Sequence, residues 1–169
     1  GKGHPTPPEE SMANFMGLSG DAFLAAIERW IGREIPDDFH TAREEEDARV
    51  LAEGIDAVAG AVAFIETLPP DLPKAIASLS SSEWIETHLD HLGLRHHFGA
   101  MIFSGHEHVE RRKPEPGIYL HAARAMGADI PRTVITEDSR VGVTGAVASG
   151  ATVIGLCAGS HCPPDHASR

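Results

Sequence analysis

The sequence Val134-Ile-Thr-Glu-Asp-Ser-Arg-Val-Gly-Val143 passes from apolar β-branched residues directly into two adjacent carboxylates, Glu137 and Asp138. An apolar run that stops at charged side chains predicts a buried parallel strand ending at the carboxyl edge of its sheet. In open α/β sheets, ligands bind at this edge. Two carboxylates are costly to bury there without a partner, and a hard cation such as Mg²⁺ is a common partner. The segment therefore predicts an α/β fold with a metal-binding strand end.

Two other segments carry polar groups at comparable positions. Ile76-Ala-Ser78-Leu-Ser80 predicts a strand ending in hydroxyl groups, and Ser80-Ser-Ser-Glu83 fits a capping box at the start of a helix. A strand-end hydroxyl beside a helix N-terminus is a good cradle for phosphate, and the alternative is that these serines only cap the helix. Arg112-Lys113-Pro114-Glu-Pro116 places a lysine directly before a helix start, where the prolines fix the direction of the chain. The alternative for this lysine is an ordinary surface position.

From residue 61 onward the hydrophobic pattern alternates between strands and helices. Short β-branched runs predict the strands, and stretches with apolar side chains on one side predict the helices. Strands separated by helices of about ten residues imply βαβ units and a parallel sheet. We expect strands at 74–78, 100–104, 133–136 and 152–156, and helices at 61–68, 82–92, 117–126 and 139–149.

The first part of the chain is helical and acidic. Apolar side chains recur on one side of 21–31, which predicts a helix ending at Gly32. A second helix is expected at 41–53, with its acidic residues on a solvated face. We therefore predict a helical domain at 1–58 and an α/β core at 59–169.

Composition narrows the classes of function. The 169 residues suit one domain, or a compact core with a small appended domain. A net charge of −11 argues against nucleic-acid binding, and no apolar run approaches the roughly 20 residues that span a bilayer. The N-terminal residues lack the apolar stretch of a signal peptide, and Cys157 and Cys162 are expected to be free thiols. We expect a cytoplasmic monomer or homodimer that binds neither nucleic acid nor membranes.

Histidines form a further group of candidate metal ligands. His88 and His91 lie three residues apart on one predicted helix, a spacing at which histidine pairs bind zinc. The sequence gives these histidines no cysteine or carboxylate partner in a recognisable zinc-binding pattern. Surface or partly buried histidines are the simpler interpretation.

Taken together, the two strand ends and the lysine before a helix start resemble, in this order, the motifs of the haloacid dehalogenase-like hydrolase superfamily. Ile76–Ser80 matches the second motif, Lys113-Pro-Glu-Pro-Gly-Ile-Tyr119 the third, and Thr136–Gly142 with Ala148–Gly155 the fourth. More narrowly, the chain is similar to the β-phosphoglucomutase-like branch of phosphatases and phosphomutases. The resemblance covers nearly the whole chain. It implies a Rossmann-like parallel-sheet core with an N-terminal helical cap.

The resemblance also implies a role for each matching residue. Ser78 would hydrogen-bond the transferring phosphoryl group, and Lys113 would neutralise its charge. Asp138 would bind Mg²⁺ directly, and Glu137 would bind it directly or through water.

Other positions would contact the substrate. Ser80 and Ser82 would touch it or only cap the helix. The segment Met16-Gly-Leu-Ser-Gly20 resembles the cap loop that faces the active site in this group. The residues expected to contribute to specificity there are Gly17, Leu18 and Ser19.

One part of the family's catalytic apparatus has no match. Its nucleophile is the first aspartate of an Asp-x-Asp motif on an N-terminal strand, and no apolar strand ending in Asp-x-Asp occurs in this sequence. Asp37-Asp38 lies in a polar segment and does not fit. The missing strand would pair between the Ile76 and Val134 strands, so its absence would leave two unpaired edges. We therefore expect the sequence to be an incomplete record of a longer chain, and inactive without that strand.

These observations together predict a function. We expect Mg²⁺-dependent hydrolysis of a small phosphorylated metabolite, such as a sugar phosphate, through an aspartyl-phosphate. Dehalogenation is disfavoured because the acidic pair suits metal-dependent phosphoryl transfer. The alternatives are a β-phosphoglucomutase-like phosphomutase and a non-catalytic fragment that binds phosphate or metal.

Overall fold

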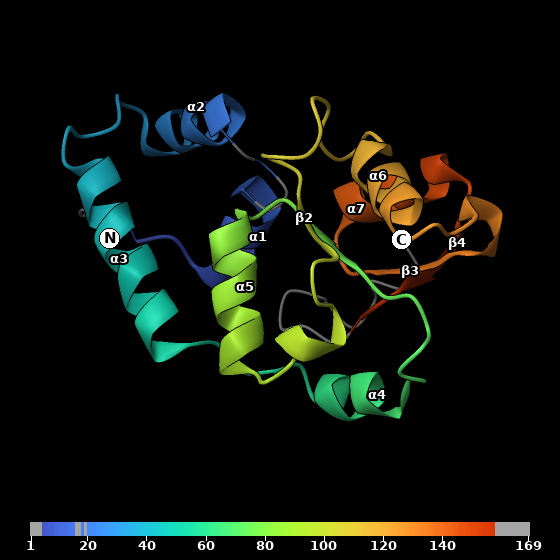
Figure 1. Ribbon diagram of the computed structural model, residues 1–169. Helices are drawn as coiled ribbons and strands as arrows, with labels where there is room; N and C mark the ends of the chain where they lie inside the picture. Colours follow the sequence, from blue (N-terminus) through green and yellow to red (C-terminus); the bar gives the residue numbers. More distant parts are fainter. Residues whose placement is uncertain (1–4, 16–17, 19, 158–169) are drawn as a thin grey trace. The chain divides into compact units, whose positions relative to one another are not determined.

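The computed structural model describes residues 5–15, 18 and 20–157 of the chain (Figure 1). The chain divides into two compact units, Gly1–Arg49 and Val50–Arg169, each of which is described by itself. None of the described helices is long and apolar enough to cross a membrane.

In the first unit, aromatic rings join two helices, α1 (Pro8–Phe15) and α2 (Gly20–Ile31). The Phe15 ring meets the rings of Phe23 and Trp30 edge to face, each with centroids 6.1 Å apart. Such pairs contribute about 0.5–1.5 kcal/mol beyond the area they bury. The apolar side of α2 that the sequence predicted is therefore the side that packs, whereas α1 was not predicted as a separate helix.

Helix α3 (Phe39–Glu53) is polar along its length and has no buried residue. Its acidic side chains are exposed, as predicted, and some form ion pairs along the helix, such as Arg49 with Glu46 at 2.6 Å. The helix begins in the first unit and ends in the second. Because exposed pairs of this kind contribute at most about 1 kcal/mol, α3 gains little stability from them.

The second unit alternates helices and strands as predicted. Two short 3₁₀ turns, Arg95–His97 and Ile130–Arg132, lie between the regular elements. Glycines in the left-handed region follow the ends of α6 and α7, where the sequence placed stops: Gly127 has φ +65° and Gly150 φ +86°. The elements are α4 (Ala61–Thr67), β1 (Ile76–Ser78), α5 (Ser82–His91), β2 (Ile102–Ser104), α6 (Gly117–Ala125), β3 (Val134–Glu137), α7 (Arg140–Ser149) and β4 (Thr152–Gly155).

The strands are parallel, but within the described residues they form two separate pairs instead of one sheet. β1 pairs with β2, and β3 pairs with β4. No hydrogen-bonded ladder joins β1 to β3 in the described residues. The missing strand inferred from the sequence was expected between these two strands. The registers align Ile76 with Ile102, Ser78 with Ser104, Val134 with Thr152, and Glu137 with Gly155.

Two hydrophobic clusters cover the two faces of β1 and β2. On one face, Ile76 and Ile102 join a cluster built on α5. On the other face, Phe103 packs beneath α6 and α7, which lie side by side (Figure 1). That second cluster also takes in Ile135 of β3 and Val153 of β4. Helices α6 and α7 therefore pack on both strand pairs at once.

The opposite face of β3 and β4 is open to solvent. Val134 is 59% exposed and Ile154 is 52% exposed. The sequence predicted a fully buried strand here, because parallel sheets are usually covered on both faces. That prediction was wrong for β3 within the described residues, where only the Ile135 side of the strand is packed against helices.

The backbone directions show which strand edges are open. Gly105 N–H donates to the Ser78 carbonyl at 2.7 Å, and Leu156 N–H donates to the Glu137 carbonyl at 2.7 Å. Because successive residues of a strand point their polar groups in opposite directions, Ala77 faces away from β2, and Thr136 faces away from β4. The β1 edge at Ala77 and the β3 edge at Thr136 therefore have no strand partner in the described part of the chain.

Candidate functional site

Lys113 connects the carboxyl ends of β1 and β3. Its ammonium donates to the Ala77 carbonyl at 3.2 Å and also to the Glu137 carboxylate. The Lys113 and Glu137 side chains are only 6% and 8% exposed. Because Ala77 immediately precedes Ser78, the last residue of β1, the ammonium lies at the carboxyl end of that strand. The three segments that the sequence analysis singled out therefore meet at one edge.

Glu137 is held on both of its oxygens. The Tyr119 hydroxyl donates to Oε1 at 2.7 Å and lies 3.0 Å from the Gly142 carbonyl. The Ser139 hydroxyl donates to Oε2 at 3.2 Å. Lys113 Nζ also lies 4.9 Å from the centre of the Tyr119 ring. Tyr119 belongs to the third predicted motif, but its contact with Glu137 was not predicted, because a helix-spacing pattern does not show which buried hydroxyl reaches which carboxylate.

The buried contacts set the protonation states of this cluster. Burial alone would raise the pKa of Glu137, but the hydrogen bonds from Lys113 and Tyr119 and the lysine charge outweigh it and lower that pKa. Burial, followed by the bond to Glu137 and its charge, raises the pKa of Tyr119. At neutral pH the site therefore holds an ionised Glu137 and a protonated Tyr119.

The Ser-x-x-Gly segment after the acidic pair has a local structural explanation. Ser139 is the N-cap of α7, and its side chain accepts the Gly142 N–H at 3.1 Å. A Cβ atom at Gly142 would overlap the Glu137 carboxylate. Glycine at this position therefore lets the first turn of α7 approach the carboxylate closely.

Asp138, the predicted metal ligand, is half-buried at the end of β3. Among the described residues, no three His, Cys, Asp or Glu side chains form a cluster that would hold a metal ion. His88 and His91, the candidate zinc ligands, are therefore in no such cluster within the described residues. Two adjacent hard carboxylates nevertheless suit Mg²⁺, which usually takes one or two protein carboxylates and fills its shell with water and phosphate. The Glu137 oxygens accept from Lys113, Tyr119 and Ser139. The roles of Asp138 and Glu137 in binding Mg²⁺ stay predictions.

The serine turn after β1 departs in detail from the sequence prediction. The N-cap of α5 is Ser81, whose hydroxyl accepts the Trp84 N–H at 3.3 Å, so the capping box predicted at Ser80 was off by one residue. Ser78 Oγ accepts the Ser80 N–H at 3.1 Å. Ser82 is bound by Glu107, a residue the sequence analysis did not single out. Ser78 and Ser80 therefore share one turn, and Ser82 belongs to the helix.

The predicted cap-loop residues fall in the first unit. Gly17 and Ser19 lie outside the described residues. Leu18 is 39% exposed. Their contribution to specificity stays a prediction.

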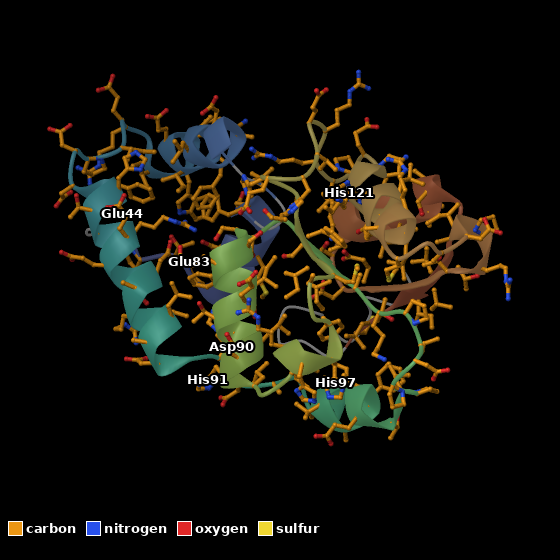
Figure 2. The ribbon with its side chains drawn as sticks, in the orientation of Figure 1. Glu44, Glu83, Asp90, His91, His97 and His121 are labelled. Carbon is orange, nitrogen blue, oxygen red and sulfur yellow. The ribbon has the colours of Figure 1, made fainter. Side chains whose placement is uncertain are left out.

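A second polar cluster lies toward the other end of α5. Figure 2 shows Glu83 near one end of this helix and Asp90 with His91 near the other. Arg95 binds Glu86 at 2.5 Å and Asp90 at 2.9 Å, beside a cavity of about 730 Å³. With its arginine already paired to two carboxylates, this cluster is a structural ion-pair network.

Comparison with known proteins places the chain among hydrolases. The sequence profile of the haloacid dehalogenase-like hydrolases matches residues 2–156. The 6-phosphogluconate phosphatase of Escherichia coli K12 is 26% identical over 159 residues, covering 93% of this chain and 70% of the relative. Hexitol phosphatase A of the same organism is 28% identical over 163 residues, covering 95% and 73%.

A solved structure gives the same result. A conserved haloacid dehalogenase-like protein of unknown function from Agrobacterium tumefaciens superimposes with a TM-score of 0.81 at 31% identity. The match covers 98% of this chain and 74% of that one.

Proposed function

The chain belongs to the haloacid dehalogenase-like hydrolase family, and on that basis we propose that it acts as a phosphatase on a small sugar phosphate. The observation that carries the proposal is the placement of Lys113, which binds the Ala77 carbonyl beside Ser78 and the Glu137 carboxylate beside Asp138. A hydroxyl, an ammonium and a carboxylate pair at one strand edge are the groups that phosphoryl transfer needs. The relatives named 6-phosphogluconate phosphatase and hexitol phosphatase A support the substrate class.

Lys113 and Ser78 would bind the phosphoryl oxygens. Ser78 Oγ accepts one N–H within its turn, which leaves its own proton to donate to a phosphoryl oxygen. The lysine ammonium has three N–H groups, of which the described residues engage two. Its position is fixed by the ion pair with Glu137, so little reorganisation would be needed as charge develops in the transition state.

We assign Mg²⁺ binding to Asp138, with Glu137 contributing through water. When bound, the ion would offset the negative charge of the phosphoryl group and help to align it. Ser80 and the cap-loop residues Gly17, Leu18 and Ser19 remain the proposed substrate contacts, and Ser82 is the weakest of the predicted set because Glu107 occupies it.

The proposal needs a carboxylate nucleophile, which we place on a strand between β1 and β3. The open edges at Ala77 and Thr136 support this position, and Lys113 lies at the same opening. An aspartate there would attack phosphorus in line, releasing the sugar hydroxyl and forming an aspartyl-phosphate that water then hydrolyses. The strand would belong to a longer form of this chain or to a second chain.

The test is phosphate release from hexitol phosphates and 6-phosphogluconate by the protein isolated from its source, with its intact mass recorded. We expect Mg²⁺-dependent release, lost in Lys113→Met and retained in the control Lys74→Met. Full activity at a mass of 18.0 kDa would remove the need for the additional strand. A heavier protein that releases no phosphate from either substrate would contradict the phosphatase proposal.

A non-catalytic role is the second candidate, because the sequence contains no Asp-x-Asp. In that case the Ser78–Lys113 site would bind inorganic phosphate without turnover. Phosphate binding by a protein that hydrolyses neither substrate would favour this candidate. Interconversion of sugar phosphates without net phosphate release would favour the phosphomutase instead.

A further inference from the structure

The turn that follows β2 carries a carboxylate to the N-terminus of α5. Glu107 Oε1 accepts the Ser82 N–H at 2.8 Å, and Glu107 Oε2 accepts the Ser82 hydroxyl at 2.6 Å. One side chain therefore accepts from both the N–H and the hydroxyl of the residue that begins α5. These two residues lie 25 positions apart in the sequence.

The position of Glu107 is set by a compact turn around Ser104. Ser104 is fully buried, its hydroxyl accepts the His106 N–H at 3.1 Å, and its carbonyl accepts the His108 N–H at 3.0 Å. Gly105 N–H donates to the Ser78 carbonyl, which fastens the same turn to β1. The turn therefore holds Glu107 in a defined place beside the serine turn.

The chemistry at this helix end favours an anion. The first N–H groups of a helix have no partner within it, and the helix dipole places partial positive charge there. The bonds from the Ser82 hydroxyl and N–H lower the pKa of Glu107, so its carboxylate is ionised at neutral pH. Of the nearby donors, Trp84 N–H is taken by Ser81 and Ser80 N–H by Ser78. In the first turn of α5, the chain's own groups thus accept from the N–H groups of Ser82 and Trp84.

We propose that Glu107 is a specificity-determining residue, which excludes anions from the first turn of α5 and confines the substrate phosphate to the Ser78 end of the serine turn. This inference rests on the proposed function. A phosphate near Ser82 would have to displace the Glu107 carboxylate and would meet its repulsion, whereas a phosphate near Ser78 meets the Lys113 ammonium.

A purely structural cap would not need the negative charge. The amide oxygen of Glu107→Gln still accepts the Ser82 N–H, and its NH2 group donates to the Ser82 hydroxyl where the carboxylate accepted from it. The variant therefore keeps the contact, reverses one hydrogen bond and removes the charge. Glu110→Gln is the matched control. Glu110 belongs to the same connection between β2 and α6 and is exposed, and its substitution changes the net charge by the same amount.

The experiment follows backbone amide signals of the ¹⁵N-labelled full chain by NMR while inorganic phosphate is added. In the wild type and in Glu110→Gln, we expect the amides of Leu79 and Ser80 to shift and that of Ser82 to stay unchanged. In Glu107→Gln, the Ser82 amide should shift as well. The apparent affinity of the Glu107→Gln protein for phosphate should be on the order of fivefold higher than that of the wild type. This is the effect of removing one unit charge at about 4 Å in water.

Identical responses of Ser82 in the wild type and in Glu107→Gln would overturn the proposal. Glu107→Ala provides a second variant with the same expectation, since it removes the carboxylate without inserting a new acceptor. A phosphate response at Ser82 in the variants, with none at Leu79 and Ser80 in any protein, would support the role of Glu107 and overturn the phosphate site of the proposed function.

Discussion

The Lys113 ammonium is paired with the Glu137 carboxylate, and both side chains are almost completely buried between the ends of β1 and β3. β1 and β3 share no hydrogen-bonded ladder in the described residues. Lys113 joins them, because it donates to the Ala77 carbonyl of β1 and to the Glu137 carboxylate of β3. Taking charges out of water is costly, and such a pair is tolerated only when further hydrogen bonds satisfy it, as Ala77, Tyr119 and Ser139 do here. The pair therefore serves the fold as well as the proposed chemistry.

Replacing Lys113 by methionine should destabilise the second unit strongly. The substitution leaves Glu137 buried without its counter-ion, and breaking a buried pair in this way costs about 3–5 kcal/mol. Urea denaturation checks the change. Lys74→Met is the control, because Lys74 donates only to backbone carbonyls in an exposed loop, and it should cost far less. The double variant Lys113→Met, Glu137→Gln should regain part of the loss, and equal stability of the two single lysine variants would contradict the assigned role of the pair.

Stability should fall in acid because of Glu137. Its pKa in the folded protein lies below the ordinary value of 4.5, so the folded state binds the proton less tightly than the unfolded state does. The stabilisation is therefore fully present above about pH 4.5 and is lost as the pH falls through the lower folded pKa. Denaturation measured across this range should show a shallower acid loss in Glu137→Gln than in the wild type. If the stability of Glu137→Gln and of the wild type fell equally with decreasing pH, the lowered pKa of Glu137 would not be the cause of the acid loss.

Gly142→Ala should be destabilising although alanine favours helices. The added Cβ would overlap the Glu137 carboxylate, and relieving such a clash by moving side chains or backbone costs about 1–3 kcal/mol. Gly155→Ala is the matched control, because a Cβ there meets nothing within 4 Å. Thermal denaturation of the two variants measures this difference in stability. A Gly142→Ala protein as stable as the control would show that α7 can shift away from the carboxylate.

Asp138→Asn should abolish Mg²⁺-dependent phosphate release while leaving the fold intact. The amide is nearly the same size as the carboxylate but carries no charge for a hard cation. Phosphate release and Mg²⁺ titration by calorimetry should both be lost, with an unchanged denaturation curve. Retained Mg²⁺ binding in this variant would remove Asp138 from the metal site.

Local patterns predicted much of the second unit. Alternating apolar runs located every strand and every α-helix after residue 60, because each element buries one regularly spaced set of side chains. The ends of α6 and α7 were predicted correctly from Gly127 and Gly150, since both glycines adopt a positive φ. The carboxyl ends of β1 and β3 were expected at one edge from the topology of parallel sheets, whereas Lys113 precedes α6 and was linked to them by the family resemblance.

Features that depend on contacts between distant residues were not predictable in this way. Three consecutive serines, 80–82, lie around the start of α5, and nothing local distinguishes Ser81 from Ser80 as its cap. Glu107 lies in a polar turn, and only the pairing of Ser78 with Ser104 brings that turn to the start of α5. The exposure of Val134 likewise depends on what covers the other face of β3, which the sequence of the strand does not encode.

The uncovered face of β3 and β4 has a consequence for how the protein behaves at high concentration. Val134 and Ile154 present apolar surface next to a strand edge whose N–H and C=O groups lack a ladder partner in the described residues. Such an edge is a template on which another molecule can add a strand. An open edge of this kind favours edge-to-edge aggregation, and Val134→Lys would oppose it by placing a charge at that edge.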